Sequence, residues 1–124
     1  MIFPKEYRHG DYYVVEFEGK CGAIDAPFLD ELFSGIASQN AYFMALDFTR
    51  ISGFHFSLFG PLVKLRNTLI SAGGALILAG FPPDARYTLQ AIKMGEGFDF
   101  RESLASILQE YPSEEEPDRE SSED

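Results

Sequence analysis

The chain has 124 residues, 45% of them hydrophobic, and a formal net charge of −10. This length fits one domain, and this hydrophobic content is typical of a globular core rather than of a disordered chain. A net negative chain without a basic stripe is unsuited to nucleic acid or anionic lipid, and its apolar runs are far too short to span or insert into a membrane.

The chain is predicted to begin with a hairpin of two strands followed by a helix. Residues 2–8 and 12–18 are rich in β-branched and aromatic side chains, and the residues between them are typical of a turn. After a break at residues 19–22, apolar side chains recur at helical spacing from Asp25, a candidate N-cap, to about Ser38.

Apolar strands and amphipathic helices alternate along the rest of the chain. Nearly continuous apolar runs at residues 42–48 and 75–79 indicate strands that are covered on both faces, and Ser52-Gly53 indicates a loop. The remaining predicted elements are helices at residues 58–72, Asp84 to about Gly95 and Ser103 to about Glu110, with a very short strand at residues 98–100. This order predicts an α/β domain with a single mixed sheet: an opening antiparallel hairpin, later parallel strands and about four helices.

The last residues differ in composition from the body. From Ser113 to Asp124 there are seven acidic residues and one basic residue, without an apolar side chain to bury. Residues 1–111 are therefore predicted to form the domain, and residues 112–124 an acidic disordered tail.

Four segments between about residues 10 and 110 carry a family resemblance. They are Glu18-Gly19-Lys20 with Ile24-Asp25-Ala26-Pro27; Ala45-Leu46-Asp47-Phe48-Thr49-Arg50-Ile51; Gly60-Pro61-Leu62 with the later Ser71-Ala72-Gly73-Gly74 and Leu76-Ile77-Leu78-Ala79-Gly80; and Pro83-Asp84-Ala85-Arg86-Tyr87-Thr88-Leu89. In order and spacing they resemble the STAS family, the sulfate transporter and anti-sigma factor antagonist domains. The resemblance implies a non-enzymatic regulatory module that binds a partner protein.

The chain departs from the family pattern at the start of the predicted second helix. Relatives commonly carry Asp-Ser-Ser-Gly or Asp-Ser-Thr-Gly there, and a partner kinase phosphorylates a hydroxyl of that motif. Here the sequence in register is His55-Phe56-Ser57-Leu58. Ser57 is the candidate phospho-acceptor or, alternatively, an ordinary helix N-cap, while Pro61 allows a third alternative in which the helix begins close to Pro61. Because the motif is degenerate, we expect the ordinary phosphorylation switch to be lost.

Three phenylalanines crowd the same junction. The rings of Phe54, Phe56 and Phe59 either form an exposed apolar patch or tuck under the end of the sheet. His55 is interpreted as a surface residue that replaces the aspartate of the family motif. Together with Ser57, these four residues are the predicted partner-binding surface.

The resemblance implies two kinds of partner, a serine kinase that doubles as an anti-sigma factor or a membrane transporter such as a phospholipid-transport ABC complex. A small α/β enzyme or ligand carrier is the alternative from another class, but the sequence shows no convergent polar set and no nucleophile–base pair. Two histidines and one cysteine without ligand spacing predict no metal and no cofactor. A homodimer is compatible with the sequence. The lone Cys21 and the absence of a signal-peptide pattern at the first residues lead us to expect a cytoplasmic protein.

Overall fold

One mixed sheet organises the computed structural model, which describes residues 1–91 and 98–110. Its five strands follow one another in chain order across the sheet. The first pair is antiparallel and every later pair is parallel, as predicted. The strands are β1 (Ile2–His9), β2 (Tyr12–Cys21), β3 (Phe43–Phe54), β4 (Ala75–Ala79) and β5 (Asp99–Arg101).

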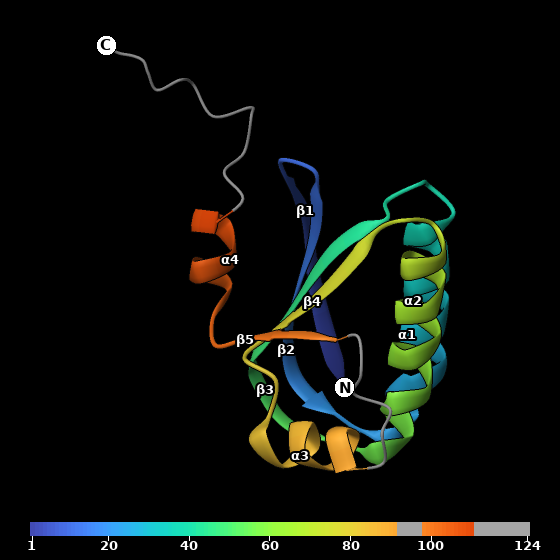
Figure 1. Cartoon of the computed structure of the whole chain (residues 1–124). Helices are drawn as coiled ribbons and strands as arrows, with labels where there is room; N and C mark the ends of the chain where they lie inside the picture. The colour runs from blue at the N-terminus through green and yellow to red at the C-terminus, as the bar shows by residue number, and fades with distance from the viewer. Residues whose placement is uncertain (92–97, 111–124) are drawn as a thin grey trace.

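Within the described residues there are four helices, and they include helices on both faces of this sheet (Figure 1). Figure 1 shows α1 and α2 side by side on one face and α4 on the opposite face. The helices are α1 (Ala26–Ala37), α2 (Phe59–Ser71), α3 (Pro83–Ala91) and α4 (Leu104–Glu110), and single 3₁₀ turns, η1 (Ala23–Asp25) and η2 (Phe56–Leu58), precede α1 and α2. The predicted α/β class and number of helices are thereby confirmed.

The core has two parts because successive side chains of a strand point to opposite faces. On β3, Leu46 and Phe48 face α1 and α2, whereas Ala45 faces the smaller cluster that contains Ile107 of α4. Covering both faces explains why the sequences of β3 and β4 are almost continuously apolar.

Two predicted boundaries are wrong. β2 continues to Cys21 although residues 19–22 were expected to break it, and β3 continues to Phe54 through the expected loop at Ser52-Gly53. The two extensions pair with each other, with Gly19 opposite Ile51 and Cys21 opposite Phe54, across irregularities in register. Backbone pairing between the two segments therefore maintains strands that neither segment specifies locally.

Two glycines end α2, at the position where the helix was predicted to end. Gly73 has a left-handed φ of 82°, its N–H donates to the carbonyl of Ile70, and the N–H of Gly74 donates to the carbonyl of Leu69. These two bonds form a Schellman motif, which satisfies carbonyls that the helix end leaves free. The chain then turns directly into β4.

Two predictions concern residues that the structure does not describe. The predicted end of the third helix near Gly95 and the acidic tail at residues 112–124 lie outside the described residues. Among residues 1–91 and 98–110, no helix has the length and apolar character needed to cross a membrane.

Candidate functional site

The two 3₁₀ turns lie together at the carboxyl ends of the parallel strands. η1 follows β2 and η2 follows β3, and the two turns contact each other. The backbone N–H of His55 donates to the carbonyl of Cys21 at 2.9 Å, which ties the ends of these strands together. In parallel sheets, this end of the strands is where binding sites form.

Ser57 lies inside η2, and its side chain is held by His55. Nδ1 of His55 accepts the backbone N–H of Ser57 at 3.1 Å, and the same nitrogen lies 2.8 Å from the Ser57 hydroxyl oxygen. Because Nδ1 acts as an acceptor for the N–H, the hydroxyl donates to it as well. His55 is thus the N-cap of this turn, and it is exposed as predicted.

This geometry excludes the interpretation of Ser57 as the N-cap of the second helix. The N-cap position of α2 belongs to Leu58, so Ser57 is not the cap of the helix. α2 begins at Phe59, which makes Pro61 its third residue. The first turn of a helix has no internal partner for its N–H groups, so the proline costs α2 no hydrogen bond.

The His55–Ser57 contact also places a hydroxyl beside an imidazole, a pair that the sequence did not reveal. Catalytic pairs of this kind need a third group that orients the base and a site for the reacting atom. Within the described residues, no group orients the far nitrogen of His55. The contacts of this side chain are with the Ser57 turn and with the stacked ring of Phe56. Capping of the turn accounts for the contact.

The three phenylalanines have different environments. Phe59 is buried, with 6% of its surface exposed, and Phe54 is half-buried among neighbouring rings. Phe56 is 72% exposed, and its ring stacks on His55 with the centroids 4.7 Å apart. Both alternatives from the sequence therefore hold in part, since two rings tuck inward and one points to solvent.

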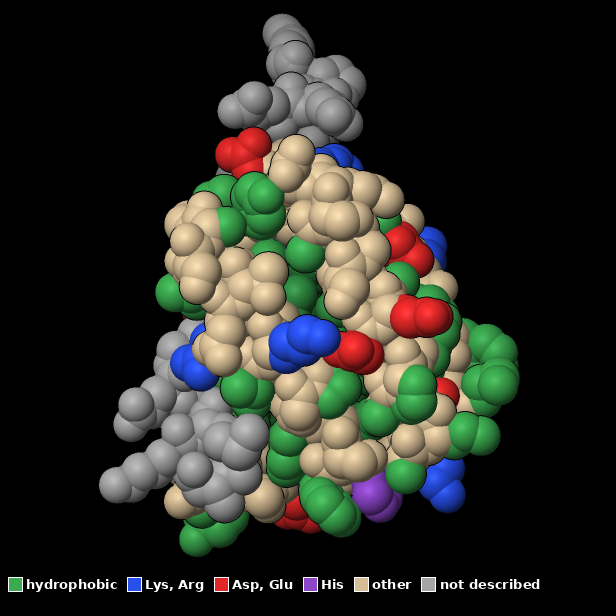
Figure 2. Space-filling view, turned by 90° about the vertical axis from the view of Figure 1, so that its right-hand side faces the viewer, with side chains coloured by type: hydrophobic (Ala, Val, Ile, Leu, Met, Phe, Trp, Pro, Cys, Tyr) green, Lys and Arg blue, Asp and Glu red, His purple; other side chains and the backbone are tan. Residues whose placement is uncertain are grey.

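Sequence analysis missed two apolar side chains beside Phe56. Ile24 of η1 is 77% exposed, and Phe28 at the start of α1 is partly exposed. Both η1 and α1 contact η2, so the elements that carry these side chains lie next to the turn that carries Phe56. Figure 2 shows apolar side chains gathered around the exposed histidine at the lower end of this face. The signal available in the sequence was Ile24, an apolar residue directly before the predicted N-cap Asp25.

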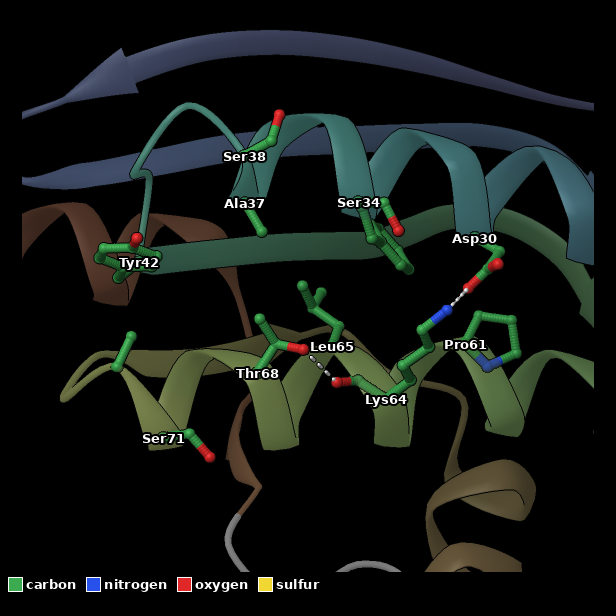
Figure 3. A pocket seen from close by; sticks show the side chains of 12 residues that line it. Asp30, Ser34, Ala37, Ser38, Tyr42, Pro61, Lys64, Leu65, Thr68 and Ser71 are labelled. Atoms are coloured by element: carbon green, nitrogen blue, oxygen red, sulfur yellow. Dashed lines mark hydrogen bonds and ion pairs between the residues drawn. The ribbon is translucent and has the colours of Figure 1, made fainter.

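A groove runs between α1 and α2 on the same face of the molecule. Figure 3 shows small side chains facing each other across it, and the Lys64 ammonium lies 3.3 Å from the Asp30 carboxylate at one end. The groove measures about 460 Å³, and its lining contains neither histidine nor cysteine. A single exposed ion pair contributes little binding energy, so the groove offers no set of groups for chemistry.

The remaining chemically active residues have structural surroundings. Burial, with the nearby charge of Asp25, raises the pKa of the Cys21 thiol to about 12, so the thiol remains protonated and unreactive at neutral pH. Asp47 lies within β3 and accepts hydrogen bonds from the backbone N–H and hydroxyl of Thr49. The part of the chain that the structure describes contains no group of three or more histidine, cysteine, aspartate or glutamate side chains placed to bind a metal.

Comparisons of the sequence and of the fold give different results. No family model and no curated protein matches the sequence. The fold is similar to that of TM1081 from Thermotoga maritima, assigned as an anti-sigma factor antagonist, with a TM-score of 0.77, 11% identity, and coverage of 87% of this chain and 93% of that chain. The Bacillus cell fate determinant SpoIIAA, an anti-sigma factor antagonist solved in unphosphorylated and phosphorylated forms, matches in its unphosphorylated form with a TM-score of 0.71, 16% identity, and coverage of 89% and 96%. A variant of RsbS from Moorella thermoacetica matches with a TM-score of 0.67, 20% identity, and coverage of 87% and 93%.

These matches show that the chain has the fold of STAS domains, which the sequence resemblance implied.

Proposed function

We propose that this chain is a non-enzymatic regulatory module of the cytoplasm that binds a partner protein through the surface around η2. The observation that carries the proposal is the exposed apolar side chain of Phe56 on η2, a turn that contacts η1 with its exposed Ile24 at the carboxyl ends of the strands. Large contiguous apolar groups on the surface of a folded domain mark interaction sites. The fold supports a regulatory role, since its similar structures are those of anti-sigma factor antagonists.

The proposed surface is made of exposed or half-buried side chains. Phe56, His55 and Ser57 are accessible, and Ile24 and Phe28 extend the surface toward α1. Phe54 and Phe59 support it from below, through a ring contact with centroids 5.5 Å apart. The partner that this surface suits is a protein, in the manner of a serine kinase or anti-sigma factor, because the exposed groups are mostly apolar rings and aliphatic chains.

Alanine at Phe56 should weaken binding of the partner by about 10- to 150-fold. This range corresponds to the roughly 1.5–3 kcal/mol gained when a phenylalanine side chain is buried in a complex. Ser57→Asp should also weaken binding, because it places a charge in an apolar contact. Affinity is measured by calorimetry against a partner purified after pull-down from the native cell.

Ile70→Ala is the matched control, because Ile70 is an exposed apolar residue of α2 away from η2. We expect it to bind with the affinity of the unaltered chain. If Phe56→Ala and Ser57→Asp also bind normally while circular dichroism shows an intact fold, the interface lies elsewhere.

Binding is expected to be constitutive, without phosphorylation of Ser57. The hydroxyl already donates to Nδ1 of His55, and the bulky Phe56 and Leu58 flank it where relatives carry small residues. A kinase would have to displace this contact to reach the oxygen. Intact-mass measurement of protein from its native cell should show the unmodified mass. A substantial population heavier by one phosphate and mapped to Ser57 would contradict this expectation.

A further inference from the structure

A pocket of about 320 Å³ opens where η2 meets α3, beside the proposed surface. Three phenylalanine rings and one proline form its apolar walls, and a carboxylate and a hydroxyl stand among them. The residues concerned are Phe54, Phe56, Phe59, Pro82, Asp84 and Thr88. The pocket therefore joins the predicted ring cluster to a helix that sequence analysis did not associate with it.

The aromatic walls of this pocket pack against neighbouring rings. The Phe54 ring is packed among three others, with centroids 5.9 Å from Phe48, 5.5 Å from Phe59 and 4.9 Å from Phe81. Phe56 is stacked on the ring of His55, which the Ser57 turn holds in place. Side chains that are already ordered lose little conformational entropy on binding.

Asp84 is the one charged side chain in the pocket lining. Within residues 1–91 and 98–110, no hydrogen bond or ion pair engages its carboxylate. Its place in the first turn of α3 is favourable to the helix dipole, but that role leaves the carboxylate oxygens free for a ligand. Arg86, on the same helix, lines a different hollow and lies over the Phe100 ring at 4.6 Å, so it does not neutralise Asp84.

We infer that this pocket receives an arginine side chain of the partner protein, an inference that rests on the proposed function. Aromatic faces carry negative electrostatic potential, and rings beside a carboxylate attract a cation. A guanidinium suits both, because its plane stacks on a ring while its N–H groups reach a carboxylate. The net charge of −10 also favours approach by a basic segment.

The test uses the full chain and a blocked tripeptide, acetyl-Gly-Arg-Gly-amide, in an NMR titration. We expect saturable shifts of the Phe54, Phe56 and Thr88 signals. The same peptide with citrulline, which is neutral and nearly isosteric, should bind about tenfold more weakly because the charge is missing. Equal binding of both peptides, or shifts spread over all acidic residues, would overturn the inference.

Two exposed positions allow variants that keep the fold. Asp84→Asn and Phe56→Ala should each weaken binding of the arginine peptide by about fivefold. Glu31→Gln on α1 makes the same charge change away from the pocket and should leave binding unaltered. If Asp84→Asn and Glu31→Gln act alike, the peptide senses only net charge and the inference fails. The proposed function would still stand if Phe56→Ala weakened the partner itself.

Discussion

Replacing Gly74 with alanine is expected to destabilise the domain by about 3 kcal/mol. An added Cβ would lie 1.9 Å from the carbonyl oxygen of Tyr42, far inside van der Waals contact. That oxygen also accepts the N–H of Ala75 at 3.0 Å, so the backbone cannot move away without breaking the start of β4. Overpacking against fixed backbone is among the few mechanisms that produce effects of this size. Urea denaturation followed by circular dichroism measures the change.

Gly35 provides the control of opposite sign. It lies in α1, and nothing lies within 4 Å of a Cβ built there. Alanine is favoured over glycine in a helix by up to about 1 kcal/mol, so Gly35→Ala should stabilise the domain. If Gly74→Ala were as stable as the unaltered chain, the turn from α2 to β4 would have to be looser than the structure indicates.

The elements that sequence analysis placed well are those specified by local pattern. In α2, Leu62, Leu65 and Leu69 recur at helical spacing, and the two glycines that end it form the Schellman motif. Alternating strands and helices then leave few arrangements of a parallel sheet. Local periodicity was therefore sufficient for the class of fold and for most of the helices.

The extension of β3 could not be predicted in the same way. Its last residues include Arg50, Ser52 and Gly53, whose composition is typical of a loop. They are strand because the end of β2 pairs with them, with Glu18 opposite Arg50. Such pairing joins segments about thirty residues apart, which no local window can detect.

At the candidate site, too, the sequence predicts what is local and misses what depends on distant residues. The ring cluster was visible because its members are neighbours in sequence, but their exposure depends on distant residues. Phe54 is half-buried because Phe48 and Phe81 pack on it, and the carboxylate beside the rings comes from α3. The contact of His55 with Ser57 depends on the 3₁₀ geometry of η2, which the sequence did not indicate.

Asp25→Ala is expected to cost about 3 kcal/mol of unfolding free energy. Asp25 is the one polar side chain that is buried among the described residues, with 3% of its surface exposed. Its carboxylate was expected to cap α1 but makes no hydrogen bond to that helix. It accepts instead the N–H of Ile2 at 3.2 Å and the N–H of Gly22 at 2.8 Å. Alanine would leave two donors without partners, at about 1–3 kcal/mol for each that is buried.

Asparagine at the same position separates hydrogen bonding from volume. Its single carbonyl oxygen accepts one of the two N–H groups, so Asp25→Asn should cost about 2 kcal/mol, less than alanine. Glu31→Ala, on the exposed face of α1, should change stability by no more than about 0.5 kcal/mol. Thermal or urea denaturation at pH 7 ranks the three variants.

Hydrogen exchange of individual amides measures locally what the Asp25 carboxylate contributes to stability. Because Asp25 joins the first residue of β1 to η1, its loss should speed exchange of the Ile2 and Gly22 amides more than that of amides at the centre of the sheet. η1 also carries the exposed Ile24 and contacts η2, so loosening this turn should weaken partner binding without removing any exposed side chain. Unaltered exchange at both amides, or stability within about 0.5 kcal/mol of the unaltered chain, would show that water replaces the carboxylate.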